Sequence, residues 1–376
     1  MSRPFLPFFS PEDGQSGSAR TGKDGGALHT PGTGGKRNQV MMPEQLSGPA
    51  ENRSPAVFPL LAVDGGGTKT DAVITDKTGK ILAKGKGGAS NYQAAGEESA
   101  AETLARVLGQ AASALEDRLG LGRKDYRIRR GVFALAGIDT AKDQTLVEGL
   151  VRRAVQTSGI QIEELLVEND ALSTLIGATK QSPGVLLIAG TGSIAFAHDG
   201  KGNFYRSGGW GHRFGDEGSG YWIGKEAVRA VLRMHDGREK PTVLSDLVLK
   251  HLRFDNHEQL YNWAYGPRYS VDEVSALSVI VEQACTLGDP VSRRILEKAA
   301  SELFLLVEAV TEKAGIGEKS FKLLLLGGVL QNNERIRHEL VQKVREKRRD
   351  AEILIPRQKP IELIIQRGLY DGEETG

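Results

Sequence analysis

Cysteine is almost absent from the chain, since Cys285 is the only one among 376 residues. A single thiol excludes a disulfide framework, a zinc site built from several thiolates and an iron–sulfur cluster held within one chain. We therefore expect Cys285 to be a small core residue in a helix.

The chain also lacks an excess of charge and any long apolar run. Its 49 basic and 48 acidic residues leave a formal net charge of +1, so nothing attracts the whole molecule to nucleic acid or to a membrane. No apolar run has the length of a transmembrane helix. Residues 5–9 are interrupted by Pro7 and make a poor signal peptide. We expect a cytoplasmic protein with no nucleic-acid or membrane partner.

The first 57 residues differ in composition from the remainder, which is long enough for two domains. Gly, Ser, Pro, Thr and charged residues dominate them, with almost no apolar periodicity. Such a segment cannot bury enough surface to offset its ordering entropy. We predict a disordered, dispensable tail over residues 1–57.

The stretch 60–75 organises the rest of the chain. An apolar run ends at Asp64, glycines follow at 65–67, and a second apolar run begins after Thr70. Both flanks are short and rich in Val, Ile and Leu, so both are predicted strands. A Walker loop or a dinucleotide motif would instead open a helix. An ordinary hairpin with a glycine bulge remains the alternative.

This glycine loop has the composition of an anion site. Glycines let backbone N–H groups approach an anion closely, and Thr68 and Thr70 add hydroxyl donors. Asp64 at the mouth of the loop would repel a bare phosphate. A divalent cation between the two would resolve that repulsion.

The same pattern recurs at residues 184–197, where an apolar strand, Gly190-Thr-Gly-Ser193 and a returning strand follow one another. Two such hairpins indicate an internal duplication. They also indicate two loops that hold one polyphosphate from opposite sides.

Carboxylates follow two further predicted strands, Asp139 after residues 130–136 and Asp170 after residues 165–169. Strand ends of α/β sheets are where catalytic groups gather, but Asp is also a common helix N-cap. For Asp139 a general base and a cap remain open. For Asp170 the cap is favoured.

Residues 206–224 interleave glycines with Trp210, His212 and Asp216, a pattern typical of neither a core nor a linker. We expect this stretch to face a ligand with many hydroxyls. Residues 240–320 are predicted to be mostly helical, with apolar stripes used for packing. A buried strand at 322–326 then enters Gly327-Gly328, where the backbone can approach a flat ring closely.

Together these motifs resemble the sugar-kinase/actin/heat-shock-ATPase superfamily. Within it, residues 58–356 resemble the N-acetylglucosamine kinases and the BadF/BadG/BcrA/BcrD-type ATPases. The resemblance implies an α/β fold of two ribonuclease-H-like (actin-like ATPase) domains with a nucleotide cleft between them. We place these domains at 58–182 and 183–376.

The resemblance also implies ligands for particular residues. It assigns the metal, Mg²⁺, to Asp64 and the general base to Asp139. ATP is assigned to Gly66, Gly67, Thr68, Lys69, Gly190, Thr191, Gly192, Ser193, Gly327 and Gly328. The sugar site is assigned to Asn91, Asp139, Gly209, Trp210, Gly211 and Asp216.

The implied function is an ATP-dependent amino-sugar kinase that acts on the 6-hydroxyl of N-acetylglucosamine, glucosamine or N-acetylmuramic acid, and by analogy a homodimer. The alternatives are a BadF-type activator ATPase, which needs more thiolates than Cys285 supplies, and a regulator that binds nucleotide or sugar without phosphoryl transfer. Two features depart from the family pattern. Ile194 replaces a polar residue, and the segment after Pro356 lacks the small-residue pattern of the closing helix, which argues against that helix.

Overall fold

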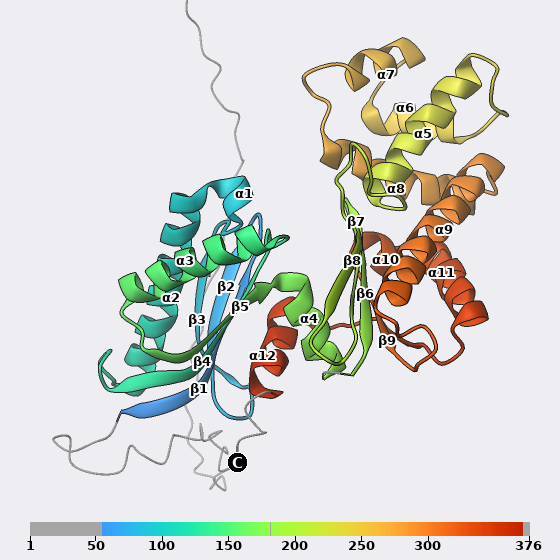
Figure 1. Cartoon of the computed structure of the whole chain (residues 1–376). Coiled ribbons are helices and arrows are strands. Elements are labelled where there is room, and N and C mark those ends of the chain that lie inside the picture. The colour runs from blue at the N-terminus through green and yellow to red at the C-terminus, as the bar shows by residue number, and fades with distance from the viewer. Residues whose placement is uncertain (1–54, 181, 371–376) are drawn as a thin grey trace, which may run out of the picture. The chain divides into compact units, whose positions relative to one another are not determined.

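The structure is a computed structural model that describes residues 55–180 and 182–370 (Figure 1). Most of the predicted disordered tail, residues 1–54, lies outside the described residues. Strand β1 begins at Ala56, so the last residues assigned to the tail belong to a sheet.

The first sheet has the strand order β3-β2-β1-β4-β5. β1 pairs antiparallel with β2 and parallel with β4, and β5 extends the parallel side. The strands are β1 (Ala56–Gly65), β2 (Thr70–Thr75), β3 (Ile81–Gly87), β4 (Tyr126–Leu135) and β5 (Ile162–Asn169).

The second sheet repeats this arrangement, with the order β10-β9-β6-β7-β8. β6 pairs antiparallel with β7 and parallel with β9, as β1 does with β2 and β4. The strands are β6 (Gly184–Ala189), β7 (Ser193–His198), β8 (Phe204–Gly208), β9 (Lys322–Leu326) and β10 (Glu352–Leu354). The predicted duplication of an α/β unit is therefore confirmed.

Both glycine loops join antiparallel neighbours. Gly65 is opposite Thr70 in the β1–β2 pair, and Ala189 is opposite Ser193 in the β6–β7 pair. The strand-to-strand prediction is correct at both places, and no helix begins at either loop.

The helices associated with the first sheet are α1 (Tyr92–Ala95), α2 (Glu97–Leu119), α3 (Ala141–Ser158), α4 (Asp170–Thr179) and α12 (Pro360–Tyr370). α2 packs on β2, β3 and α3. Its buried residues recur at helical spacing and include Leu104, Val107, Leu108, Ala111 and Leu115.

The expectation that no closing helix forms after Pro356 is wrong, because α12 packs on β1 and α4 (Figure 1). Ile364 and Ile365 join Leu60 and Val132 in one core cluster. The small residues that permit the close approach lie partly on the partner helix. A Cβ on Gly177 of α4 would stand 2.0 Å from the Leu363 carbonyl oxygen. The boundary predicted at 182/183 falls between α4 and β6 and stays a prediction.

The helices associated with the second sheet are α5 (Gly220–His235), α6 (Leu244–Leu252), α7 (His257–Ala264), α8 (Val271–Thr286), α9 (Pro290–Lys313), α10 (Gly328–Asn332) and α11 (Glu334–Lys347), of which α6 and α7 pack on other helices. One large core cluster joins these helices to β6, β7 and β9. Cys285 lies buried in that core on α8, as predicted. Among the described residues, no helix has the length and apolarity needed to cross a membrane.

Gly177→Ala should destabilise the protein, since the added methyl group collides with the backbone of α12. We expect the free energy of unfolding to fall by about 1–3 kcal/mol. The matched control is Gly149→Ala at an exposed position on α3, where a Cβ meets nothing within 4 Å. That control should be neutral or stabilising by about 0.5–1 kcal/mol. Equal losses in the two variants, measured by chemical denaturation, would contradict the α4–α12 contact.

Candidate nucleotide and sugar site

Backbone hydrogen bonds fix the first glycine loop. The N–H of Gly66 donates to the Lys69 carbonyl (3.0 Å), and the Gly66 carbonyl accepts from Ser90 (3.0 Å) and Asn91 (3.1 Å). Gly67, Thr68 and Lys69 are exposed at the tip. The loop thus has a fixed base, and its predicted phosphate-binding residues face outward.

Thr70 does not contribute the hydroxyl donor that the sequence indicated. Its side chain is fully buried and bonds the Gly88 carbonyl (2.7 Å) and the Ser90 hydroxyl (2.8 Å). The Thr70 hydroxyl therefore joins β2 to the segment after β3, and Thr68 alone offers an exposed hydroxyl here.

Asp64 is partly buried at the end of β1, and burial raises its pKa to about 6. The charge of Asp170 contributes to this rise, while the Lys69 ammonium opposes it. Burial also raises the pKa of Asp170, to which the charge of Asp139 adds. Asp170 is thus close enough to repel the charge of Asp64 and to be repelled by that of Asp139, an environment that favours a bound cation.

Asp139 is not the cap of the helix that follows. Thr140 is the N-cap of α3, in a capping box with Asp143, so the capping alternative for Asp139 is wrong. The Asp139 carboxylate instead accepts a hydrogen bond from the Arg206 guanidinium at 3.2 Å and is 38% exposed. The cap role expected for Asp170 is wrong, because Asn169 is the N-cap of α4 and Asp170 is its first residue. The Asp170 carboxylate nevertheless accepts from the Ala171 N–H.

Asn91 lies against the turn that carries Asp139. A Cβ on Gly137 would stand 2.7 Å from the Asn91 side-chain oxygen, and Gly137 has a φ of +90° that favours glycine. That oxygen also caps α1 by accepting from the Gln93 N–H at 2.9 Å. Asn91 therefore connects the first glycine loop with the Asp139 turn.

The second glycine loop is held by the start of α5. The Gly190 carbonyl accepts from the Gly220 N–H at 2.7 Å, and the Thr191 carbonyl accepts from Tyr221 at 3.3 Å. Thr191 is exposed. Ser193 is buried, and its hydroxyl donates to the Glu217 carbonyl at 2.7 Å. The Ser193 side chain thus fixes the following loop.

Asp216 lies beside this second loop. Its carboxylate accepts from the Ser193 N–H at 3.3 Å, and a Cβ on Gly192 would meet the carboxylate at 3.0 Å. Burial raises the pKa of Asp216, and hydrogen bonding from Ser193 opposes the rise. Among described contacts, Asp216 therefore belongs with the predicted phosphate loop, and its assignment to the sugar stays a prediction.

Arg206 joins Asp139 to the glycine stretch predicted to bind sugar. Its guanidinium donates to the carbonyls of Gly208 (3.1 Å) and Gly209 (2.6 Å) and lies 5.1 Å from the centre of the Trp210 ring. Trp210 is 73% exposed, and Gly211 is exposed beside it. The structure thus brings Asp139 and Gly209–Gly211 to one positively charged group.

Ile194, the departure noted in the sequence, has a packing role. A Cβ on Gly209 would stand 2.3 Å from its side chain, so Ile194 fills the space beneath the glycine stretch. Gly209 also has a φ of +71°, which favours glycine independently.

A cavity of about 450 Å³ opens where the second glycine loop meets α10. A Cβ on Gly190 would stand 3.9 Å from the Gly328 N–H, so the two predicted nucleotide motifs are neighbours. Gly327 is held tightly, because a Cβ there would stand 2.3 Å from the Ala189 carbonyl. The lining residues are Gly190, Thr191, Ile223, Asp272, Ser275, Ala276, Ser278, Val279, Glu282, Gly328, Val329, Asn332 and Asn333.

Comparison with known proteins places this arrangement in a family, since residues 61–365 match the BadF/BadG/BcrA/BcrD ATPase family. The chain belongs to that family. The recognition made from the motifs is confirmed.

Relatives of this BadF-family chain are known as kinases. It is 35% identical over 273 residues to the N-acetylmuramic acid/N-acetylglucosamine kinase of Clostridium acetobutylicum, covering 73% of this chain and 86% of the relative. It is 33% identical over 301 residues to the N-acetyl-D-glucosamine kinase of Dictyostelium discoideum, covering 78% and 92%. The solved structure of a proposed N-acetylglucosamine kinase from Chromobacterium violaceum shares the fold, with a TM-score of 0.62, 23% identity and coverage of 83% and 99%.

Two parts of the site in this BadF-family protein were missed from the sequence. We assigned residues 240–320 to packing alone, but α8 supplies one wall of the cavity. The small polar residues Ser275 and Ser278, which interrupt the apolar stripe beside Val279, are the sequence signal that could have indicated this cavity wall. Arg206 carried no such signal, because only the fold brings it to Asp139.

Asp64→Asn should stabilise the ligand-free protein. The pKa of Asp64 is higher in the folded chain than its ordinary value of 3.8, so the carboxyl destabilises the fold increasingly as pH rises from about 4 to about 6, and fully above that. We expect the variant to gain about 1–3 kcal/mol at pH 8 and nothing at pH 3.5. Chemical denaturation at both pH values measures the change in the free energy of unfolding, with Asp117→Asn at an exposed position as the control. A gain in stability that does not depend on pH would contradict the raised pKa of Asp64.

Proposed function

We propose that this chain is an ATP-dependent amino-sugar kinase that transfers a phosphoryl group to the 6-hydroxyl of N-acetylglucosamine, glucosamine or N-acetylmuramic acid. The observation that carries the proposal is the cavity where the Gly190–Thr191 hairpin meets Gly328. In a chain whose relatives are named as amino-sugar kinases, that cavity has the size and position expected of a nucleotide site.

The adenosine of ATP would enter this cavity. Gly328 allows a flat ring to approach the backbone, and Asn332 and Asn333 line the same space with polar groups. The phosphates would extend to Thr191, whose side chain is exposed at the tip of its hairpin. The loop of Gly66, Gly67, Thr68 and Lys69 would hold them from the other sheet, with Gly192 and Ser193 shaping the second loop.

The residues around Asp64 fit a hydrated Mg²⁺. Within the described residues, no three Asp, Glu, His or Cys side chains gather closely enough to hold a metal alone. Mg²⁺ characteristically keeps waters and takes few carboxylates together with substrate phosphates. The mutual repulsion of Asp64 and Asp170 also favours a nearby cation. When bound, the ion would neutralise the charge that develops on the transferred phosphoryl group.

Asp139 would act as the general base. Its carboxylate is exposed and paired with Arg206, and Asn91 lies against Gly137 of the same turn. With the sugar held by Asn91 and by Gly209–Gly211, Asp139 would take the proton from the 6-hydroxyl as that oxygen attacks the γ-phosphorus. The ion pair with Arg206 would hold the carboxylate in position until the sugar arrives.

Three further predictions accompany this function. The two domains at 58–182 and 183–376 would close over the substrates and limit ATP hydrolysis by water. A cytoplasmic location and a homodimer also remain predictions. The location can be tested on the tagged protein and the homodimer on the purified protein, in both cases without reference to the reaction.

The proposal is tested directly by an ADP-release assay across amino sugars and plain hexoses. We expect ADP release to depend on an amino sugar and to yield its 6-phosphate. ADP release that no sugar stimulates would instead favour an activator ATPase. Nucleotide and sugar binding without product would favour a regulator.

Asp139→Asn should lower kcat about 10²–10⁴-fold, because the amide cannot accept the hydroxyl proton. Sugar binding, measured by calorimetry, should stay within a few-fold of the wild-type value. The control is Asp246→Asn, at an exposed carboxylate on α6. Wild-type turnover in Asp139→Asn would remove this residue from the role of base.

Val279→Glu should raise the KM for ATP at least tenfold and leave the KM for sugar unchanged, since it puts an anion into the cavity wall. Val279 is 66% exposed, so the substitution should not unfold α8. Leu305→Glu, at an α9 residue that is 58% exposed and outside the cavity lining, is the matched control. An unchanged KM for ATP would place the nucleotide elsewhere.

A further inference from the structure

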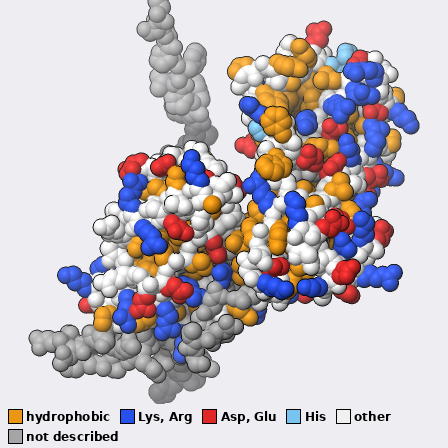
Figure 2. All heavy atoms as spheres, viewed as in Figure 1, with side chains coloured by type: hydrophobic (Ala, Val, Ile, Leu, Met, Phe, Trp, Pro, Cys, Tyr) orange, Lys and Arg blue, Asp and Glu red, His pale blue; other side chains and the backbone are white. Residues whose placement is uncertain are grey.

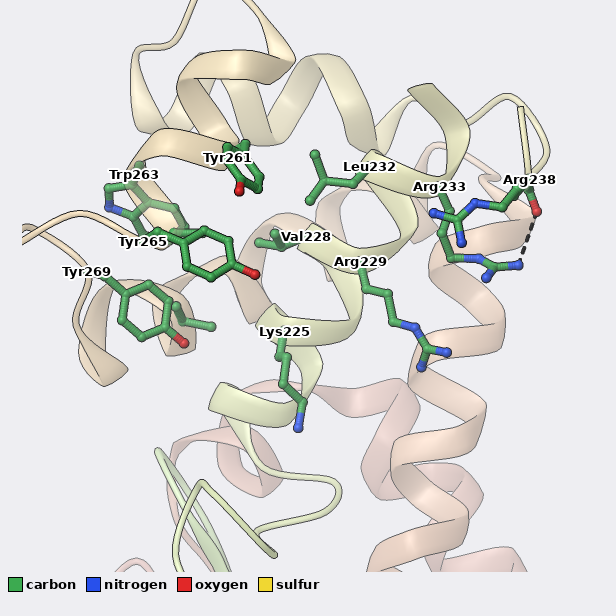
Figure 3. Close-up of a pocket in the computed structure, with 12 residues that line it drawn as sticks. Lys225, Val228, Arg229, Leu232, Arg233, Arg238, Tyr261, Trp263, Tyr265 and Tyr269 are labelled. Carbon is green, nitrogen blue, oxygen red and sulfur yellow. Dashed lines mark hydrogen bonds between the residues drawn. The ribbon is translucent and has the colours of Figure 1, made fainter. Parts of the chain in front are cut away.

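A second cavity, of about 560 Å³, lies among α5, α7 and α8 (Figure 3). It shares no lining residue with the cavity at Thr191 and Gly328. One wall comes from α5 and its end, and the other from α7 and the segment before α8. The proposed phosphoryl transfer uses none of it. Its basic and aromatic lining residues are Lys225, Arg229, Arg233, Arg238, Tyr261, Trp263, Tyr265 and Tyr269.

The back of the aromatic wall is fixed by its own contacts. The Trp263 indole donates to Glu273 at 3.3 Å, and its ring lies 5.5 Å from that of Tyr269. The Tyr269 hydroxyl shares a hydrogen bond of 2.7 Å with that of Tyr221. These rings form a rigid surface, as a binding wall requires.

The front of this wall consists of exposed rings. Tyr265 is 81% exposed and Tyr261 is 55% exposed, and their ring centres lie 5.0 Å apart. In Figure 3 both side chains lie across the cavity from α5. Large exposed aromatic side chains beside a cavity are typical of surfaces that pack on the apolar face of a ligand ring.

The facing wall is basic. Lys225, Arg229 and Arg233 recur every four residues on α5, and Arg238 follows, while no acidic residue lines the cavity. Glu226 pairs with Arg229, and Asp236 with Arg238. Lys225 and Arg233 form no ion pair with any described residue. Lys225 lies 5.8 Å from the centre of the Tyr221 ring, and the Arg233 guanidinium donates to the Arg238 carbonyl at 3.2 Å. Figure 2 shows basic and hydrophobic side chains side by side over α5–α7.

We propose that this cavity binds a sugar that carries a phosphate or carboxylate group. The ring would pack on Tyr261 and Tyr265, and the anionic group would meet Arg233, while Lys225, more than two turns away on α5, would add longer-range attraction. An arginine and a lysine beside an aromatic surface match both parts of such a molecule. The cavity volume suits a ligand of hexose phosphate size. The preference for a sugar over a nucleotide as the ligand rests on the proposed function. The existence of the cavity and the character of its walls do not depend on that function.

The position of α5 gives this site a route to the nucleotide. The N-terminus of α5 is hydrogen-bonded to the Gly190 and Thr191 carbonyls, and Ile223 of the same helix lines the nucleotide cavity. A ligand at Lys225 and Arg233 therefore binds the helix that positions the second phosphate loop. The product of the proposed reaction belongs to the ligand class assigned here.

Equilibrium dialysis with radiolabelled N-acetylglucosamine 6-phosphate tests the proposal. The full chain is first saturated with unlabelled N-acetylglucosamine and a non-hydrolysable ATP analogue, which fill the transfer site. We expect one labelled molecule per chain, and binding at least tenfold weaker in Arg233→Gln and in Tyr265→Ala. Tyr265→Phe, which keeps the ring, and Arg335→Gln, at an exposed arginine outside the cavity, should bind as the wild type does.

Three results would overturn the inference: no binding by the saturated wild-type chain, equal binding in the four variants, or displacement of the label at lower concentrations of AMP than of unlabelled sugar phosphate. A chain that phosphorylates amino sugars yet shows one of these results loses only this second site. A chain that binds sugar phosphate in the expected variant pattern but transfers no phosphoryl group loses only the proposed kinase function. Circular dichroism of each variant verifies that it is folded.

Discussion

The site depends on two glycine carbonyls that accept hydrogen bonds from segments distant in the chain. The Gly66 carbonyl accepts from Ser90 and Asn91, and the Gly190 carbonyl accepts from Gly220. Each bond ties a hairpin tip to the element that carries the neighbouring functional residues. Because backbone groups make these bonds, side-chain substitutions leave them in place. The exposed hydroxyls of Thr68 and Thr191 are consequently held on rigid supports.

Electrostatics divide the site into two kinds of surroundings. The carboxylates near Asp64 repel one another in partly buried surroundings, whereas Asp139 is exposed and paired with Arg206. The first environment favours a cation, and the second leaves a carboxylate exposed beside a guanidinium. Two carboxylates at comparable strand ends thus acquire different chemistry from their neighbours.

The sequence predicted the elements whose signals are local. Glycine and threonine between two apolar strands are sufficient to predict each hairpin. Prediction failed where distant segments decide the outcome. The Thr70 hydroxyl is turned inward by Ser90, α8 becomes a cavity wall, and Arg206 meets Asp139 across 67 positions of sequence. The α12 helix was missed because part of its small-residue contact, Gly177, lies on α4 rather than on α12 itself.

The packing of α12 also has a consequence for synthesis on the ribosome. Leu60, Val132 and their neighbours in the first sheet are covered by Ile364 and Ile365, which are translated after both sheets. Until then, the part of this apolar face that α12 covers is without that helix. The nascent protein therefore carries an aggregation-prone surface through most of translation, and chaperones that shield such surfaces would act before the last helix emerges.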